Sequence, residues 1–290
     1  MGADASVELV VGADGTIGGP LFRAIAAAGR PVVGTTRRKD SQEFEHLDLA
    51  NPSASWNGPP VAVAYLCAAM TNLDACDRDP VGSARINVEA TLRLAESLLR
   101  QGSFVVFFST NHVFDGSRPL RKPEEPTCPF NEYGRQKAAG EQQLLALENT
   151  AVLRLTKVIG PTVPLFDRWI AAVRAGQTIR PFADLSLAPV KLARVLKAAQ
   201  AIGSGRCPGI HHLSGDEDLS YDDAARIGLG VLGMDLSLLS PGYWRESGSA
   251  QIAPPRFSSL DVTRTIALLN EPIESSSQTV RDYFETQSAQ

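Results

Sequence analysis

The sequence predicts an α/β fold with a doubly wound parallel sheet. In the first half of the chain, short apolar runs without polar alternation are separated by segments of helical periodicity. Such runs are typical of strands in a parallel sheet that crossover helices cover on both faces. A glycine-rich turn stands between the first apolar run and the first helical segment, as is usual at the start of such a sheet. We therefore expect a Rossmann-type domain, joined by a smaller, interleaved α/β lobe.

The expected strands are short and largely apolar. They comprise residues 7–11, 31–34, 61–67, 104–109, 152–155 and 210–213. Helices are expected between them, at residues 17–28, 81–100, 131–147, 166–175 and 191–201. In the helix at 81–100, apolar side chains recur at every fourth position, which places them on one buried face. Asn131 is a suitable N-cap for the helix that follows it, and the serine run at 275–277 is expected to be a loop.

Composition and charge exclude several classes of protein. Hydrophobic residues make up 43% of the 290 residues and charged residues 21%, values typical of an ordered globular protein. The net charge of −4 argues against nucleic acid or an anionic membrane as the main partner. The four cysteines form no close pair and no metal-ligand spacing. We therefore expect reduced thiols, no metal site and a cytoplasmic location.

Three glycines follow the first expected strand with the spacing G-x-x-G-x-x-G. Gly12 permits a sharp turn, Gly15 lets the backbone approach a pyrophosphate, and Gly18 lets the helix pack closely on the sheet. The free N–H groups and the partial positive charge at the helix N-terminus favour the same anion. The alternative is a plain strand–helix turn. The position within a βαβ frame favours a dinucleotide-binding loop.

The end of the second expected strand bears on the choice of cofactor. Sites for NAD usually carry Asp or Glu there, which bonds the 2′-hydroxyl of the adenosine ribose. This sequence instead has Thr35, Thr36, Arg37 and Arg38. We expect no carboxylate to compete with a 2′-phosphate, which the two guanidinium groups would hold. NADP(H) is therefore favoured, and the alternatives are NAD(H) and a merely solvated basic loop.

A second motif combines a phenol, an amine and a hydroxyl. Tyr133 and Lys137 are four residues apart on an expected helix, so their side chains share one face. A nearby cation lowers the pKa of a phenol, which then exchanges a proton with a substrate oxygen more readily. Thr110 ends a buried strand, with Ser109 beside it, at the edge where open α/β sheets bind ligands. The alternatives are an ordinary surface helix and a hydroxyl that only caps the strand.

Length and pattern together predict two parts. The chain of 290 residues exceeds the size at which a single hydrophobic core usually stops growing. Regular alternation of strands and helices ends near residue 156. We therefore expect a dinucleotide-binding Rossmann domain at residues 1–156 and a mainly substrate-binding lobe at residues 157–290. The segments near 190–215 are expected to return to the Rossmann domain.

These motifs, with others along the chain, are similar to those of a known family. The similarity extends over nearly the whole chain. It is carried by residues 12–18, 68–71 with Asp74, Asn87, 109–116, 133–137, 153–156, 209–215 and 256–261. The chain resembles the extended short-chain dehydrogenase/reductase family, and within it the dTDP-4-dehydrorhamnose reductases.

The resemblance implies a role for each matching residue. Thr110 would polarise a substrate carbonyl, and Tyr133 would act as the general acid. Lys137 would bind the nicotinamide ribose and lower the pKa of Tyr133. Asn87 would take part in the cofactor site and tie the central helix to the active-site strand. The other implied cofactor residues are Gly12, Gly15, Thr16, Ile17 and Gly18 for the pyrophosphate, Asp48 and Leu49 for the adenine, and Cys67, Ala68, Ala69 and Thr71 after the fourth strand.

The substrate side departs from the family. Lys157 stands where the reductases usually carry a tryptophan that flanks the sugar, and Asn111 replaces an aspartate. Lys157 would reach a sugar hydroxyl or a diphosphate oxygen, and a plain surface lysine is the alternative. Arg180 and Arg256 are candidates for a nucleotide diphosphate on electrostatic grounds. The family's chemistry therefore transfers to this chain better than its rhamnose substrate does.

The sequence thus predicts an NADPH-dependent oxidoreductase that reduces a keto group on a nucleotide-activated deoxysugar. The expected partner is this small molecule, and a homodimer stays open. One rival is a nucleotide-sugar epimerase or dehydratase with bound NAD, which the basic run at residues 35–38 disfavours. The other rival is a non-catalytic NADP-binding regulatory subunit, which the intact Thr110, Tyr133 and Lys137 disfavour.

Overall fold

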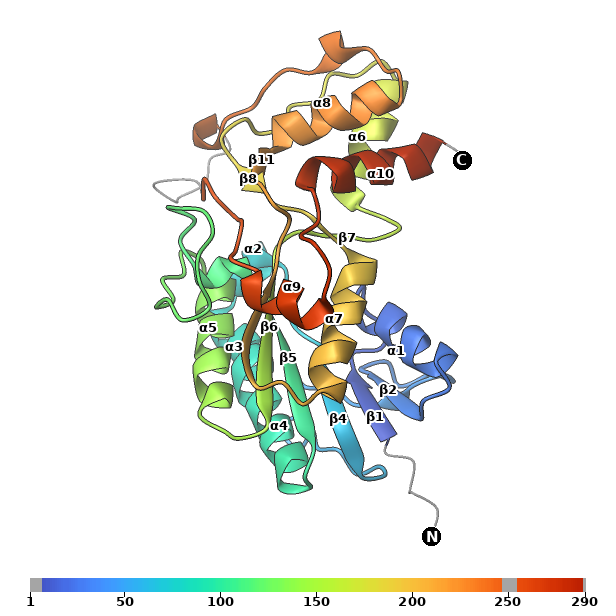
Figure 1. Ribbon diagram of the computed structural model, residues 1–290, viewed down its shortest axis with the longest axis vertical. Coiled ribbons are helices and arrows are strands. Elements are labelled where there is room, and N and C mark those ends of the chain that lie inside the picture. The colour runs from blue at the N-terminus through green and yellow to red at the C-terminus, as the bar shows by residue number, and fades with distance from the viewer. Residues whose placement is uncertain (1–6, 247–254, 289–290) are drawn as a thin grey trace. The chain divides into compact units, whose positions relative to one another are not determined.

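A seven-stranded sheet forms the centre of the fold. The computed structural model describes residues 7–246 and 255–288 (Figure 1). The strand order is β10-β6-β5-β4-β1-β2-β3. In chain order, the strands are β1 (Val7–Val11), β2 (Val32–Thr36), β3 (Glu45–His46), β4 (Val61–Leu66), β5 (Phe104–Thr110), β6 (Thr150–Leu155) and β10 (Gly209–Leu213).

The strand order confirms the doubly wound arrangement. β1 pairs in parallel with both β2 and β4, and the β2–β3 and β4–β5 pairs are also parallel. The chain therefore builds the sheet outward from β1 in one direction and then from β4 in the other. The point between β1 and β4 is the topological switch point, where the connections diverge and leave a crevice at the carboxyl ends of the strands.

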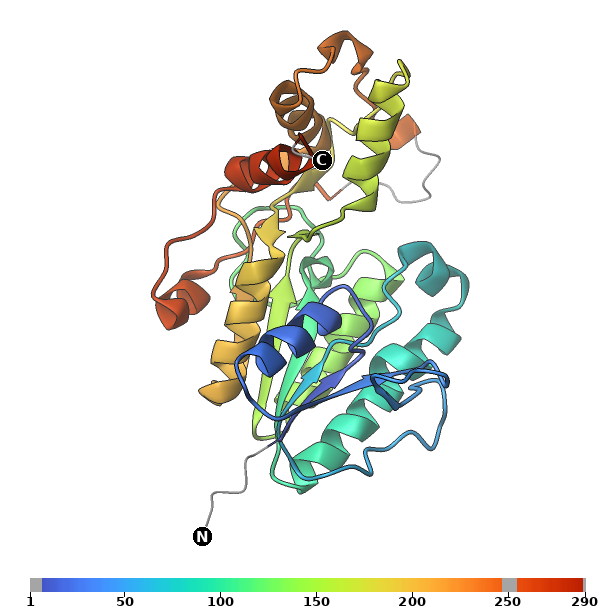
Figure 2. The same cartoon turned by 90° about the vertical axis from the view of Figure 1, so that its right-hand side faces the viewer.

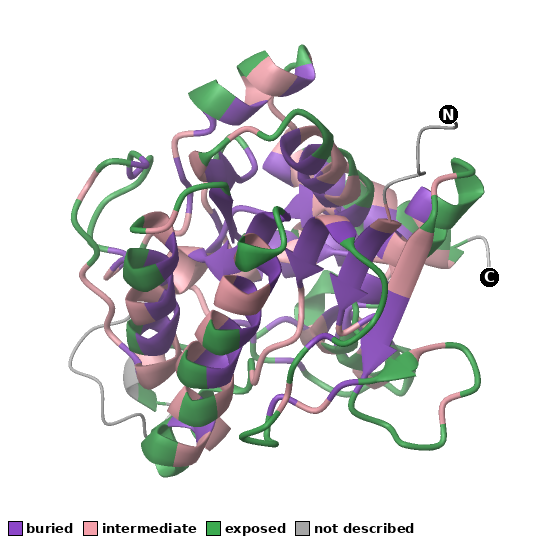
Figure 3. Cartoon of the chain, turned by 90° about the horizontal axis from the view of Figure 1, so that it is seen from below, coloured by how far each residue is buried: buried purple, intermediate pink, exposed green. Residues whose placement is uncertain are grey.

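Helices cover both faces of this sheet, as Figure 2 shows. On one face lie α1 (Gly18–Ala27) and α7 (Leu192–Ser204), and on the other lie α4 (Thr91–Arg100) and α5 (Glu132–Leu145). Buried side chains of α4 and α5 pack with those of the central strands to form one hydrophobic core. In Figure 3 the strands are mostly buried, while the outward sides of the helices are exposed. The sheet is thus apolar on both faces, which explains the missing alternation in its sequence.

The long helix expected at residues 81–100 is interrupted by a π-helical segment. It consists of α3 (Pro80–Ala84), the π-helix η1 (Arg85–Ala90) and α4. The hydroxyl of Thr91 donates to the carbonyl oxygen of Ile86 at 2.9 Å, five residues earlier. Short π-helical turns often accompany functional sites because they reorient side chains within a helix.

The chain divides into two compact units. The first comprises Met1–Phe114, Pro126–Arg154 and Leu196–His211, and the second comprises Asp115–Glu125, Leu155–Val195 and His212–Gln290. The loop at Asp115–Glu125 thus belongs to the second unit, although it lies within residues 1–156.

The second unit has its own core and more helices than the sequence indicated. Its helices are α6 (Pro164–Arg174), α8 (Tyr221–Val231), α9 (Thr263–Leu269) and α10 (Ser276–Ser288). Two small sheets accompany them, formed by β7 (Val158–Ile159) with β9 (Val190–Lys191) and by β8 (Ser186–Leu187) with β11 (Leu219–Ser220). The loop expected at residues 275–277 is wrong, because α10 begins at Ser276 and packs Val280 and Phe284 into this core.

Three further observations concern the chemistry of the described residues. None of the four cysteines forms a disulfide bond. Within residues 7–246 and 255–288, no group of three or more His, Cys, Asp or Glu side chains has the arrangement of a metal site. In the same ranges, no helix has both the length and the apolar character that a membrane crossing requires.

Candidate active site

A cavity of about 700 Å³ opens at the carboxyl ends of β1, β2 and β4, at the switch point of the sheet. Its walls come from the glycine-rich loop and from the segments that follow β2, β3 and β4. The lining residues are Gly12, Asp14, Gly15, Thr16, Ile17, Gly18, Thr36, Arg37, Arg38, Leu47, Asp48, Leu49, Ala50, Cys67, Ala68, Ala69, Met70, Thr71, Asn72 and Ile86. Every cofactor residue expected from the sequence is in this set, except Asn87 and Lys137.

The glycine-rich loop owes its shape to its glycines. Gly12 has a φ of +84°, and a Cβ atom there would lie 2.9 Å from Ala68. A Cβ atom on Gly18 would lie 2.1 Å from the carbonyl oxygen of Gly12. Side chains at these two positions would therefore push the start of α1 away from the ends of β1 and β4.

The loop and α1 fit the pyrophosphate of a dinucleotide. A Cβ atom on Gly15 would meet only the Gly12 oxygen, at 3.2 Å, so the backbone there is open to the cavity. The N-terminus of α1 has no side-chain cap and no acidic residue in its first turn. Within this turn the Gly19 N–H donates to the Gly15 oxygen at 3.0 Å and Pro20 has no N–H, so the positive end of the helix dipole is what favours an anion here.

Beside the end of β2, the cavity contains a carboxylate that the sequence interpretation did not consider. Asp14 comes from the glycine-rich loop and accepts a hydrogen bond of 2.8 Å from the hydroxyl of Thr36. The same carboxylate oxygen lies 3.3 Å from Nε of Arg38. The expectation that no carboxylate competes with a 2′-phosphate did not take this side chain into account. It considered only the residues at the end of the second strand, whereas Asp14 precedes Thr36 by 22 positions.

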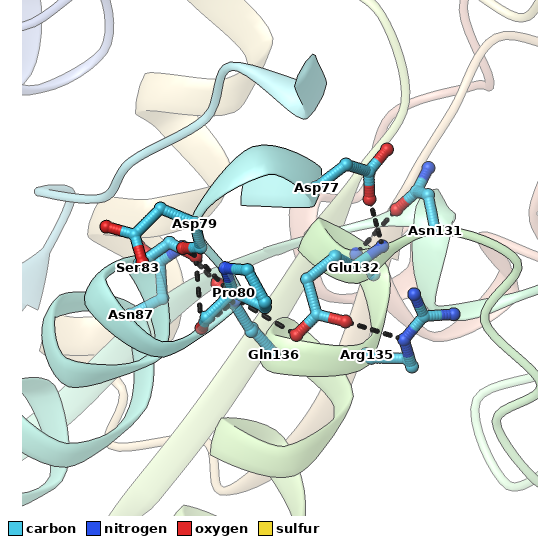
Figure 4. A network of polar contacts seen from close by, with 10 residues as sticks. Asp77, Asp79, Pro80, Ser83, Asn87, Asn131, Glu132, Arg135 and Gln136 are labelled. Atoms are coloured by element: carbon cyan, nitrogen blue, oxygen red, sulfur yellow. Dashed lines mark hydrogen bonds and ion pairs between the residues drawn. The ribbon is translucent and has the colours of Figure 1, made fainter. Parts of the chain in front are cut away.

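Asn87 makes its contacts in a different place from the one expected. Its side chain is 1% exposed and does not line the cavity. Its amide accepts from the backbone N–H of Met70 at 2.8 Å and donates to the Met70 oxygen at 2.9 Å. It also donates to Oε1 of Gln136 at 2.8 Å (Figure 4). Asn87 thus ties η1 to the cavity wall after β4 and to α5, and not to the strand β5.

The network in Figure 4 continues into the first turn of α5. Gln136 donates to the hydroxyl of Ser83 at 2.7 Å and to Glu132 at 3.1 Å. Glu132 in turn accepts from Arg135 at 2.8 Å, and its backbone N–H donates to Asp77 at 3.1 Å. These bonds join α2 (Leu73–Arg78), α3 and η1 to the start of the helix that carries Tyr133. They fix where that helix begins.

The N-terminus of α5 also packs directly on the segment after β5. Asn131 caps α5 by accepting from the Gly134 N–H at 2.7 Å, which confirms the expected N-cap. Its amide nitrogen lies 2.9 Å from Nδ1 of His112. A Cβ atom on Gly134 would lie 2.1 Å from the carbonyl oxygen of His112, so only glycine permits this approach. The His112 ring stacks on Phe130 at 5.6 Å and therefore supports the packing of this corner.

The hydroxyl, the phenol and the amine of the second motif lie on these adjoining elements of the first unit. Thr110 ends β5, is 7% exposed and accepts a hydrogen bond from the His112 N–H at 3.2 Å. Tyr133 begins α5, and its ring lies edge-on to His112 at 6.2 Å. Lys137 is buried, with Nζ 3.8 Å from the centre of the Phe107 ring in β5. Ser109 has a buried hydroxyl without a hydrogen-bond partner among the described residues.

Burial governs the protonation of both Tyr133 and Lys137. It raises the pKa of Tyr133 well above its ordinary value of 10.0. It also lowers the pKa of Lys137 to about 7, although the charges of Glu141 and Cys67 act in the opposite direction. The lower pKa expected for Tyr133 is therefore wrong for this structure, because burial outweighs the effect of a cation that itself titrates near neutrality. Tyr133 stays protonated at neutral pH.

The candidate substrate residues lie in the second unit and differ in their surroundings. Lys157 follows β6 and is partly buried, and its pKa is lowered by burial and by the charge of Arg168. Arg180 is exposed and pairs with Glu246 at 2.7 Å. Arg256 is exposed. Burial and the nearby charge of Arg168 thus disfavour the charged form of Lys157, and a bound anion would offset this effect.

Several cavity residues were missed by sequence reasoning. They are Asp14, Leu47, Ala50, Met70, Asn72 and Ile86. All six adjoin expected residues in the chain, so extending each expected segment by one residue would have found them. Asp14 is adjacent to Gly15 and Ile86 to Asn87, but the contacts of Asp14 depend on the fold of the loop and the place of Ile86 depends on the π-helical turn.

Comparison with known proteins assigns the chain to a family. Residues 8–288 match the family described as the RmlD substrate binding domain. The chain belongs to this family. A probable dTDP-4,6-dihydroxy-2-methyloxan-3-one 4-ketoreductase of Streptomyces antibioticus is 32% identical to it over 261 residues, which cover 85% of this chain and 82% of the relative. A dTDP-4-dehydrorhamnose reductase of Streptomyces griseus is 29% identical over 282 residues, which cover 91% and 88%.

Solved structures share the fold of this RmlD-family chain. A dTDP-4-dehydrorhamnose reductase of Bacillus anthracis in complex with NADP has a TM-score of 0.82 at 20% identity, over 98% of this chain and 99% of that one. MoeE5 in complex with UDP-glucose and NAD has a TM-score of 0.80 at 20% identity, with the same coverage. These structures confirm the Rossmann-type fold, while the family match and the named relatives above confirm the resemblance to the reductases.

Proposed function

We propose that this protein reduces the keto group of a nucleotide-activated deoxysugar and uses NADPH as its preferred hydride donor. One observation carries the proposal. The first unit holds a glycine-lined cavity at the switch point of the sheet, together with Thr110, Tyr133 and Lys137 on the adjoining β5 and α5. Membership of the RmlD family and the similarity to a 4-ketoreductase support the class of substrate.

The proposed chemistry assigns one task to each side chain. The dinucleotide, when bound, supplies the hydride. The Thr110 hydroxyl donates a hydrogen bond to the substrate carbonyl oxygen, and Tyr133 gives its phenolic proton to the same oxygen. The raised pKa of Tyr133 suits this direction, because the phenol must carry its proton before reduction begins. Lys137 bonds the nicotinamide ribose and orients it beside Tyr133.

The two ends of the cofactor and the sugar nucleotide are assigned to different parts of the chain. Gly12, Gly15 and the N-terminus of α1 would hold the pyrophosphate, and Arg37 and Arg38 would hold the 2′-phosphate. The second unit, with Lys157, Arg180 and Arg256, would bind the nucleotide sugar. We assign the protein to the cytoplasm on the basis of its free thiols. A homodimer is compatible with all of these assignments.

A turnover experiment with a panel of substrates tests this proposal. The purified chain is mixed with NADPH and a panel of 4-keto-6-deoxy sugars linked to dTDP, UDP or GDP, and absorbance loss at the nicotinamide band is followed. We expect oxidation with at least one dTDP-linked member, and slower oxidation when NADH replaces NADPH. Absence of oxidation with every member by folded protein would refute the reductase. Co-purified NAD⁺ together with conversion of one sugar nucleotide into its epimer would favour the epimerase.

A further inference from the structure

The carboxylate of Asp14 occupies a defined position at the adenosine end of the cavity. Its side chain is 27% exposed, whereas its partner Thr36 is 1% exposed and comes from the end of β2. The Thr36 hydroxyl donates to Asp14 at 2.8 Å and accepts from the Arg38 N–H at 3.2 Å. A hydrogen bond from a buried hydroxyl to a charged oxygen is strong and directional. The carboxylate is therefore held in place by a side chain of the sheet and not only by an exposed arginine.

The same carboxylate engages one of the two cations assigned to a 2′-phosphate. Nε of Arg38 lies 3.3 Å from Asp14, while the Arg38 side chain remains 71% exposed. Arg37 and Arg38 both line the cavity beside Asp14. A 2′-phosphate that binds Arg38 must therefore share this guanidinium with Asp14 or displace it, and it must also approach a negative charge.

A 2′-hydroxyl meets the opposite situation. A ribose hydroxyl is neutral and donates a hydrogen bond, and a carboxylate is its usual partner in sites for NAD. That carboxylate normally stands at the end of the second strand, where this chain has Thr36. Here the glycine-rich loop supplies it instead, and Thr36 holds it beside the strand end. The site thus combines one group that favours NAD with two that favour NADP.

We propose that Asp14 is a specificity-determining residue for the dinucleotide, and that it limits the preference for NADPH by holding Arg38 and by accepting the 2′-hydroxyl of NADH. The inference rests on the dinucleotide site of the proposed function and deepens it. It does not depend on the identity of the sugar or on Tyr133. Arg37 and Arg38 attract the 2′-phosphate of NADPH. Asp14 weakens this attraction because it pairs with Arg38 and repels the phosphate.

Equilibrium binding to the full chain tests this inference without turnover. The dissociation constants of NADP⁺ and NAD⁺ are measured by titration calorimetry for the wild type and for Asp14→Asn. This substitution keeps the size of the side chain and an oxygen that accepts the Thr36 bond. We expect NADP⁺ to bind about five- to tenfold more tightly and NAD⁺ to bind severalfold more weakly, as befits one partly exposed charge. Higher salt should reduce the first effect.

Two further variants isolate the part played by Arg38. Asp40 is exposed, lies two residues beyond Arg38 and does not line the cavity. Asp40→Asn should therefore change the dissociation constants of NADP⁺ and NAD⁺ by less than about twofold. Arg38→Gln should weaken NADP⁺ more than NAD⁺, and in its background Asp14→Asn should no longer strengthen NADP⁺. An Asp14→Asn effect on NADP⁺ that is equally large without Arg38 would overturn the mechanism.

The outcomes separate this inference from the proposed function. If both dinucleotides bind the wild type and Asp14→Asn leaves the ratio of their dissociation constants unchanged, the inference is refuted and the reductase stands. If neither dinucleotide binds the folded wild type, both are refuted. If Asp40→Asn shifts the ratio as much as Asp14→Asn does, the effect is one of general charge, and the role of Asp14 is refuted.

Discussion

The dinucleotide cavity of the first unit and the basic side chains of the second unit are built in different ways. The cavity depends on backbone geometry, with glycines where any side chain would collide with Ala68 or with the Gly12 oxygen. Lys157, Arg180 and Arg256 are long side chains that are at least partly exposed. A site of the first kind is fixed when the chain folds, whereas a site of the second kind can change its ligand through single substitutions. This difference explains why the chemistry of a family persists while its substrates vary.

Apart from loss of the proposed acid itself, the largest effect should follow from a substitution that disturbs the backbone geometry of the first unit. In Gly134→Ala, the new methyl group would lie 2.1 Å from the His112 oxygen, so α5 must move away from the end of β5. We expect kcat/KM to fall more than about a hundredfold, because a displacement of about 1 Å at a catalytic group has that cost. Overpacking of this kind should also destabilise the fold by about 1–3 kcal/mol. Reduction kinetics and urea unfolding measure the two effects.

Gly230→Ala is the matched control for this prediction. Gly230 lies within α8, and no atom lies within 4 Å of the Cβ position. The substitution should leave the rate unchanged and raise the free energy of unfolding by about 0.5–1 kcal/mol, because alanine favours a helix over glycine. Wild-type rate and stability in Gly134→Ala would show that the close approach of α5 to β5 has no functional importance.

The roles of the glycines were predictable from the sequence because local backbone geometry alone requires glycine at these positions. The spacing of Gly12, Gly15 and Gly18 reports where the chain must turn and where a helix must approach a strand. The place of Asp14 was not predictable, because its contacts with Thr36 and Arg38 exist only after the loop folds onto the end of β2. The pKa of Tyr133 was misjudged for a similar reason, since the degree of burial cannot be read from a pair of residues on one helix face.

The second largest effect concerns the buried amine of Lys137. Its pKa is about 7 in the folded chain, below the ordinary lysine value of 10.5, so the unfolded chain binds one more proton between these two values. The free energy of unfolding should therefore rise with pH above about 7, by at most about 1.4 kcal/mol per pH unit from this group. Below pH 7, both states carry the proton and the full cost of burying the charge remains.

Lys137→Met tests this expectation because it keeps an apolar stem and removes the titrating group. The difference in unfolding free energy between the two proteins, measured by urea denaturation from pH 7 to 9.5, cancels the contributions of all other groups. The wild type should gain stability relative to the variant as the pH rises. Parallel pH profiles would mean that Lys137 titrates at its ordinary pKa, in solvent-like surroundings.

The smallest effects are expected among the basic residues of the second unit, and they should differ from each other. Lys157 is partly buried beside the charge of Arg168, so an anionic ligand would relieve an unfavourable arrangement. Lys157→Met should therefore raise the KM for the sugar nucleotide by about tenfold, the value of one charge-assisted contact. Arg180→Ala should raise KM by only about twofold and lower stability by less than about 1 kcal/mol, because its guanidinium is exposed and is already paired with Glu246, which weakens its contact with a ligand.

Steady-state kinetics with varied sugar nucleotide measures both of these changes. A larger rise in KM for Arg180→Ala than for Lys157→Met would reverse the assignment within the second unit. The dissociation constant of NADP⁺ serves as the control in both variants. It should stay at the wild-type value, because the cavity is lined by residues of the first unit.

The second unit was also harder to predict as a fold. The helices α8 and α10 gave no clear signal, because glycines interrupt the first and serines begin the second. Their stability comes from packing against each other and α6, where aromatic side chains such as Phe166 and Phe284 meet at 5.3 Å. Tertiary contacts of this kind outweigh local preference, and a single sequence does not display them.

The central claim is that Tyr133 gives a proton to a sugar carbonyl while a hydride arrives from the bound dinucleotide. The most direct test is single-turnover transfer from 4-deuterated NADPH to a dTDP-linked 4-keto-6-deoxy sugar, with product deuterium followed by mass spectrometry. The wild type should place deuterium on the former keto carbon. Tyr133→Phe should bind NADPH equally well but transfer about 10²–10⁴ times more slowly. Equal transfer rates for the two proteins would contradict the claim.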